Sequence, residues 1–154
     1  MRQIEAVQRR ATKQIPEMKN MEYADRLKKL KLPTLLYRRM RGDMIETYKI
    51  LTEKYDPDVS NFLPLHREKR PTSTSRGNSL KIMKRLSKKD LRKYTFSNRI
   101  ADWWNGLPEE VVAAPSLNAF KNRLDKFWDN LTVKYDFETA LNNTRPLNAP
   151  GGRD

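Results

Sequence analysis

Apolar residues recur every three or four positions near the start of the chain, which is the spacing of one face of an α-helix. Ile4, Val7, Ala11 and Ile15 predict a helix over residues 3–15 that Pro16 ends. A second, shorter helix is predicted over 22–31, with an apolar face made of Tyr23, Leu27 and Leu30. Both helices are therefore predicted to be amphipathic.

The longest helix is predicted over 34–54, beginning just after Pro33. Its apolar positions are Leu36, Met40, Met44, Ile45, Tyr48, Leu51 and Tyr55. Its other side carries Arg38, Arg39, Arg41, Lys49 and Lys54. Because Gly42 inside a helix costs about 1 kcal/mol relative to Ala, we expect a kink or a close backbone approach there.

The middle of the chain has a different composition. Residues 56–79 are rich in Pro, Ser and Thr and predict a linker or a long loop. Beyond it, Leu80 and Ile82 alternate with polar residues, as do Tyr94 and Phe96. Two alternating pieces on either side of a lysine-rich bend predict a short β-hairpin.

Two further helices are predicted toward the C-terminus. The first covers 98–105, with Ser97 as its N-cap and Gly106-Leu107-Pro108 at its end. Ser116 is expected to cap the second helix. Its apolar face consists of Leu117, Phe120, Leu124, Phe127 and Leu131. We expect Trp104 to pack against this face and Glu109-Glu110 to lie in a turn, while no role is assigned to Trp103.

These segments predict a mostly α-helical fold in four parts. A small helical bundle is expected over 1–55, followed by a basic loop with the short β-hairpin over 56–97. A pair of helices is expected over 98–135, and a disordered tail over 136–154.

The charge of the chain is strongly positive and unevenly distributed. Its 154 residues include 32 Lys and Arg against 19 Asp and Glu, a formal net charge of +13. Segment 67–93 holds 11 basic residues against Glu68 and Asp90, a net charge of +9, whereas 98–154 has a net charge of −1. A dense block of one charge favours a polyanion such as the phosphates of nucleic acid. The alternative is a solvated, disordered basic loop that binds nothing in particular.

Several classes of site lack the residues that they require. The absence of cysteine excludes disulfides, zinc–thiolate sites, iron–sulfur clusters and thiol catalysis. The single histidine, His66, excludes sites with two imidazoles and is expected to be solvated. No apolar run approaches the roughly 18 residues of a membrane span, and Met1 leads into Arg2-Gln3 without a signal-peptide core. We expect an intracellular protein, nuclear or cytoplasmic, with no metal, cofactor or small-molecule substrate.

Several runs of residues occur together in the order and spacing of a known family. They are the runs from Val7 to Lys13, Arg26 to Leu35, Tyr37 to Met44, Arg76 to Lys81, Phe96 to Arg99, Trp104 to Val112 and Ser116 to Leu124. From Ile4 to Trp128 the chain resembles the region downstream of the catalytic palm in LINE-type (non-LTR) retrotransposon reverse transcriptases. The similarity is closest to the jockey and chicken-repeat clades.

The resemblance implies a helical thumb that holds the template–primer duplex, followed by the extreme C-terminal segment of the polymerase. Catalysis in that family needs metal-binding aspartates in an aromatic-Ala-Asp-Asp turn of the palm. Here Tyr23-Ala24-Asp25 is followed by Arg26, whose charge would oppose two metal ions. We therefore expect Tyr23 in the core, Asp25 on the helix surface, and a non-catalytic fragment or decayed copy of an RNA-directed DNA polymerase.

The predicted contacts with nucleic acid are basic side chains that bind phosphate and do not read bases. They are Lys28, Lys29, Lys31, Arg38, Arg39, Arg41, Arg76, Lys81, Lys84, Arg85, Lys88, Lys89, Arg92 and Lys93. The expected partner is an RNA–DNA hybrid or another duplex, bound with little regard to sequence, and no membrane.

Two alternatives stay open. The C-terminal part, 98–131, can instead form a helical protein–protein interaction module, with the basic segment incidental to it. The chain can also be a retroelement remnant without a function. Salt separates the first alternative from nucleic-acid binding, because counterions compete with phosphate contacts and hardly affect an apolar interface.

Overall fold

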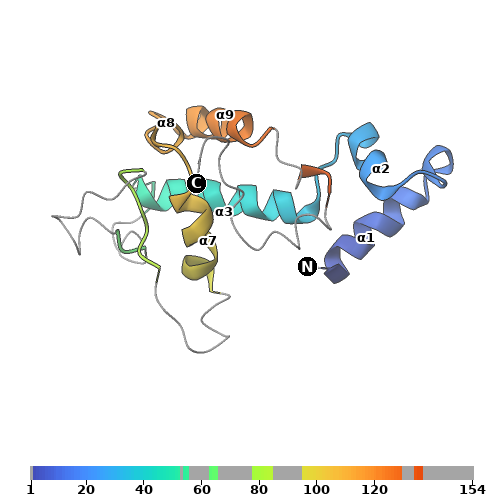
Figure 1. The fold of residues 1–154 in the computed structure, drawn as a ribbon, viewed down its shortest axis with the longest axis horizontal. Coiled ribbons are helices and arrows are strands. Elements are labelled where there is room, and N and C mark those ends of the chain that lie inside the picture. Colours follow the sequence, from blue (N-terminus) through green and yellow to red (C-terminus); the bar gives the residue numbers. More distant parts are fainter. Residues whose placement is uncertain are drawn as a thin grey trace, which may run out of the picture. The chain divides into compact units, whose positions relative to one another are not determined.

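A computed structural model of the chain describes residues 2–52, 54–55, 63–65, 78–84, 95–129 and 134–136. Within these residues there are six α-helices, one turn of 3-10 helix and no β-strand (Figure 1). The predicted mostly α-helical fold is therefore confirmed for the described part of the chain. No helix in that part is both long enough and apolar enough to cross a membrane.

The described residues form two compact units. The first contains those up to Arg41 together with Asp129 and 134–136, and the second contains those from Gly42 to Trp128. The predicted boundaries at 55, 97 and 135 stay predictions.

The first unit begins with α1 (Arg2–Lys13), a 3-10 turn η1 (Pro16–Met18) and α2 (Tyr23–Leu30). Helices α1 and α2 pack together (Figure 1). Both were predicted within a few residues of these bounds, and Pro16 follows the end of α1 as expected. Leu27 is fully buried on the predicted face of α2.

The buried face of α1 differs from the prediction. Ile4 and Val7 are exposed, at 56% and 64% of their surface, and Ala11 is exposed as well. The buried residues of α1 are Glu5 and Thr12. Amphipathic helices usually turn their apolar face to the core, but here hydrogen-bond partners on α2 and α3 select the polar face instead.

Helix α3 (Leu35–Leu51) contributes to both units and continues through Gly42 without a break. Met40, Met44 and Tyr48 are buried on the predicted apolar face, whereas Tyr55 lies beyond the helix and is exposed. Gly42 itself is exposed, and a Cβ added there would meet nothing within 4 Å. The close backbone approach predicted at Gly42 is therefore wrong.

We predict that Gly42→Ala stabilises the protein by up to about 1 kcal/mol, because Ala has the higher helix propensity and the site has room for a methyl group. Urea denaturation should show a higher midpoint with an unchanged slope. Gly42→Pro is the opposing control, since it removes a helix hydrogen bond and should cost about 3 kcal/mol. An alanine variant less stable than the wild type would contradict this description of α3.

The core of the second unit is aromatic. Helices α7 (Phe96–Asn105), α8 (Glu109–Val112) and α9 (Leu117–Phe127) contribute to it with the end of α3. The Phe120 ring stacks on Tyr48 with centroids 4.4 Å apart and lies 5.9 Å from Trp104. The Tyr48 hydroxyl donates to the carbonyl of Ala114 at 2.7 Å. The predicted packing of Trp104 against Phe120 is thus confirmed, and Tyr48 joins it from α3.

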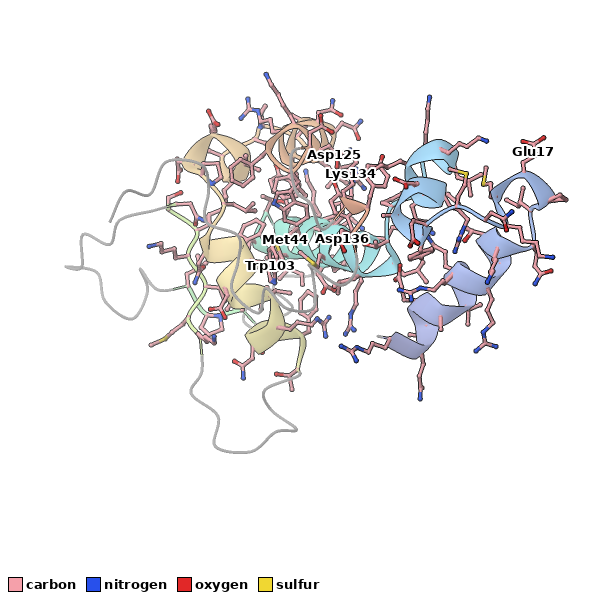
Figure 2. All side chains as sticks on the ribbon, turned by 45° about the vertical axis from the view of Figure 1, so that its right-hand side comes forward. Glu17, Met44, Trp103, Asp125, Lys134 and Asp136 are labelled. Atoms are coloured by element: carbon pink, nitrogen blue, oxygen red, sulfur yellow. The ribbon has the colours of Figure 1, made fainter. Side chains whose placement is uncertain are left out.

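Trp103, to which the sequence assigned no role, is half-buried and meets Trp128 edge to face. Their ring centroids are 6.2 Å apart (Trp103 is labelled in Figure 2). Both tryptophans of α7 therefore pack against aromatic residues of the second unit.

One local prediction in the second unit is confirmed and two are wrong. Ser116 caps α9 as expected, with its hydroxyl accepting from the Ala119 N–H at 3.2 Å. Glu109-Glu110 opens α8 and is not a turn, and α7 begins at Phe96, so that Thr95 and not Ser97 holds the N-cap position.

The predicted β-hairpin is contradicted at one of its residues. Phe96 is helical, because α7 extends two residues further toward the N-terminus than its predicted start. Ile82 forms an isolated antiparallel bridge with Leu65. Tyr94 and the lysine-rich bend lie outside the described residues.

We predict that Phe120→Ala costs about 3–5 kcal/mol, the usual effect of truncating a buried aromatic residue. Urea denaturation followed by tryptophan fluorescence should report the loss, since Trp104 is a neighbour. Phe127→Ala, at a half-buried position of the same helix, should cost clearly less. Equal losses for the two variants would show that Phe120 is not central to the core.

Candidate nucleic-acid interface

Three of the predicted phosphate contacts lie at the end of α2. Lys28, Lys29 and Lys31 are all exposed. Lys28 forms an ion pair of 3.7 Å with Asp25, and both side chains are more than half exposed. A surface pair of this kind contributes little, so it leaves Lys28 available to a phosphate. The exposure of Asp25 also confirms its prediction as a surface residue.

Lys31 ends α2 in a conformation that glycine usually occupies. Its φ angle of 53° is left-handed, and its N–H donates to the carbonyls of Leu27 and Lys28. A lysine at this position carries a backbone cost of about 1 kcal/mol that glycine avoids. The helix dipole, which favours a positive charge at the end of a helix, offsets part of this cost.

The other three predicted contacts of the first unit lie on α3. Arg38 and Arg39 are exposed, whereas Arg41 is half-buried. Thr34 caps the helix by accepting from the Tyr37 N–H at 3.2 Å, and its own N–H donates to the carbonyl of Lys134 at 2.9 Å. The arginines therefore project from a helix whose first turn is firmly held.

The start of α3 is held a second time by Glu5 of α1. This carboxylate is 1% exposed. It accepts from the Leu35 N–H at 3.0 Å and from the Tyr23 hydroxyl at 2.7 Å. A carboxylate at a helix N-terminus is favoured by the unpaired N–H groups and the helix dipole. Glu5 therefore joins α1, α2 and α3 through one side chain.

Arg26 is the second buried charge of the first unit. Its guanidinium donates to the Thr12 hydroxyl at 3.2 Å and to the main-chain carbonyls of Arg9 and Met21. It also lies over the Tyr23 ring, 5.5 Å from the centroid, while Arg9 lies over the same ring at 4.9 Å. Arg26, which disrupts the aromatic-Ala-Asp-Asp pattern in the sequence, is thus a structural residue between α1 and α2.

The basic segment 67–93 is described only over 78–84, which belongs to the second unit. Lys81 is half-buried, and Lys84 is exposed and pairs with Asp102 of α7 at 2.5 Å. The remaining predicted contacts, like His66, lie outside the described residues: Arg76, Arg85, Lys88, Lys89, Arg92 and Lys93.

Residues 78–83 are fixed to α7 and α8 by polar contacts that the sequence did not predict. Asn78 donates to the carbonyls of Trp104 and Leu107 at 3.0 and 3.1 Å. Asn105 exchanges two hydrogen bonds with the main chain of Ile82, at 2.8 and 2.9 Å.

Two further contacts complete this attachment. The Trp104 indole donates to the carbonyl of Leu80 at 2.8 Å. Glu109 accepts from the N–H and the hydroxyl of Ser79, at 2.6 and 2.8 Å. The solvated, disordered loop considered for the basic segment therefore does not apply to 78–83.

Among the described residues, no group of three or more Asp, Glu or His side chains is placed to hold a metal ion. Comparison of the chain with protein-family models, with curated proteins and with solved structures gave no match. The resemblance to retrotransposon reverse transcriptases accordingly stays a prediction.

The Tyr23–Glu5 contact predicts an unusual alkaline titration. Burial, reinforced by the hydrogen bond to the Glu5 carboxylate, raises the pKa of Tyr23 well above its ordinary value near 10. Because the protonated hydroxyl makes this bond, its stabilising effect is complete below about pH 10 and is lost as pH rises through the raised pKa. In an absorbance titration of the six tyrosines, Tyr23→Phe should reduce the absorbance change at high pH.

The control for this titration is Tyr55→Phe, at an exposed position, which should keep the absorbance change at high pH. An absorbance change at high pH of the same size in the wild type and in Tyr23→Phe would show that the contact with Glu5 is absent in solution.

Proposed function

We propose that this chain binds duplex nucleic acid through phosphate contacts, as a non-catalytic thumb-like part of a retroelement RNA-directed DNA polymerase. The observation that carries the proposal is the set of exposed cations between the end of α2 and the first turns of α3. These are Lys28, Lys29, Lys31, Arg38 and Arg39. Arginine binds phosphate oxygens in a bidentate manner, and lysine acts as a mobile point charge.

The rigidity of the support favours this function. Arg38 and Arg39 stand on a helix whose start is bonded to Thr34 and to the buried Glu5. Side chains on a fixed helix lose less freedom on binding than side chains on a loop. We infer that Arg38 and Arg39 of α3 set the position of the duplex.

The described surface favours a duplex over a single strand. Proteins that bind single strands stack bases on aromatic side chains. Among the aromatic side chains of the described residues, only that of Tyr55 is exposed. Its hydroxyl donates to Glu46, and Lys49 lies over its ring. Phosphate contacts without base stacking suit the regular backbone of a double helix.

The burial of apolar residues in 98–131 argues against the alternative of a protein–protein interaction module. That alternative required the large apolar residues of 98–131 to face a partner. Trp104, Phe120 and Leu124 are instead fully buried within the second unit. This observation supports assigning the function to the cations of the first unit.

We predict that log affinity for an RNA–DNA hybrid falls against log salt, and that the cations of α2 and α3 contribute roughly −4 to −5 to the slope, as for about five phosphate contacts. The Arg38→Gln/Arg39→Gln double variant should reduce the steepness by about 2, at 0.9 per contact. Titrations of a labelled hybrid between 50 and 200 mM salt measure both slopes.

The matched control is Lys54→Gln/Lys126→Gln, which removes the same charge from exposed positions of the second unit and should keep the wild-type slope. Affinity that does not respond to salt, or equal effects of the two double variants, would overturn the proposal. An unchanged urea midpoint in each variant confirms that the fold is intact.

A further inference from the structure

Helix α1 presents three distinct sides, which follow from its 100° rotation per residue. The buried side contains Glu5 and Thr12, with Gln8 between them donating to the carbonyl of Pro33 at 3.2 Å. A second side carries the exposed apolar residues Ile4, Val7 and Ala11. All basic residues of the helix fall on a third side, within a sector of about 100°: Arg2, Arg9, Arg10 and Lys13.

The charged residues of the third side are all basic. Glu5 is the one acidic residue of α1, and it is buried against Tyr23 and the start of α3. The four basic residues are all exposed. Figure 2 shows nitrogen-tipped side chains projecting from α1. We call this side, defined by Arg2, Arg9, Arg10 and Lys13, the cationic side of α1.

The helix dipole explains only part of this pattern. Arg10 and Lys13 lie in the last turn, where positive charge stabilises a helix. Arg2 lies in the first turn, where the same dipole disfavours it. The helix dipole therefore accounts for Arg10 and Lys13 but not for Arg2.

We propose that the cationic side of α1 is a second phosphate-binding surface, in addition to the cations of α2 and α3. This inference rests on the proposed function and extends it to residues of α1 that are not among the predicted phosphate contacts. From Arg2 to Lys13 the helix rises about 16 Å, which matches roughly five base-pair steps of a duplex at 3.4 Å each. The surface therefore contacts successive phosphates along a backbone and carries no base-reading group.

The arrangement fits a nucleic-acid backbone better than an anionic membrane. A helix lying on a membrane usually has a broad apolar face with large residues, bordered by basic residues. The apolar side of α1 offers only Ile4, Val7 and Ala11, and the cations lie together on one other side. Binding through that cationic side would turn the apolar residues away from the ligand.

The test compares two variants of the full chain. Arg2→Gln/Arg10→Gln/Lys13→Gln removes three charges and keeps residues with good helix propensity. Arg9 is left in place, since it packs over Tyr23 and its carbonyl binds Arg26. Ile4→Ser/Val7→Ser is the matched control, which changes exposed residues of the same helix without changing its charge.

If α1 adds three phosphate contacts to the five on α2 and α3, the slope for hybrid binding becomes roughly −7, and the triple variant should return it to roughly −4 to −5, at 0.9 per contact. The control should keep the wild-type slope, and both should retain the wild-type helical circular dichroism signal. A triple variant with the wild-type slope, alongside an Arg38→Gln/Arg39→Gln variant with a reduced one, would overturn this inference and leave the proposed function standing. Wild-type slopes in both would overturn the two together.

Vesicles of phosphatidylserine and phosphatidylcholine provide the remaining comparison. We expect Ile4→Ser/Val7→Ser to leave any association with vesicles unchanged. Vesicle binding that this variant abolishes, combined with hybrid binding that the triple variant leaves intact, would identify α1 as a membrane-surface helix and overturn the inference.

Discussion

The first unit depends on one buried carboxylate. Glu5 closes the N-terminus of α3 and holds the hydroxyl of Tyr23, so a single side chain of α1 determines where the other two helices begin. Its burial is tolerable because both of its oxygens accept hydrogen bonds and the positive end of the α3 dipole lies beside it. Removing its partners would leave a buried charge without compensation, which is among the most costly changes in a protein interior.

The second unit is held together by different means. Its centre is the contact of Trp104, Phe120 and Tyr48 from three helices, where large rings exclude water and stack. Polar side chains beside that core bind the irregular segment 78–83, as Asn105 binds the main chain of Ile82. Hydrogen bonds of buried charged side chains in one unit and aromatic packing in the other thus occur in one short chain.

This difference explains what the sequence could predict. Apolar periodicity located α2, α3 and α9, and the Ser116 cap was recognisable because its bonding partner is three residues away. The buried face of α1 was not recognisable, because Glu5 is specified by Tyr23 and Leu35, which lie 18 and 30 residues further along the chain. A search for apolar periodicity considers only apolar residues, so it predicted that Ile4 and Val7 are buried. Both are exposed.

In the candidate site, too, the sequence predicted some features and missed others. Exposure of Lys29, Arg38 and Arg39 follows from their positions opposite apolar residues, and these positions were correctly predicted. The structural role of Arg26 was not, since its acceptors are main-chain carbonyls and a hydroxyl rather than an acidic residue that a sequence pattern would reveal. The ion pair of Lys84 with Asp102 was not predicted either, since the two residues are 18 positions apart.

The same burial also shapes the surface. With Glu5 buried against Tyr23 and Leu35, the exposed charged residues of α1 are all cationic. At the same time Glu5 anchors α3, which carries Arg38 and Arg39. The hydrogen bonds of Glu5 therefore leave the exposed charges of α1 positive and fix Arg38 and Arg39 on a rigid helix. Both effects favour a rigid, regularly spaced polyanion, and a nucleic-acid duplex has that geometry.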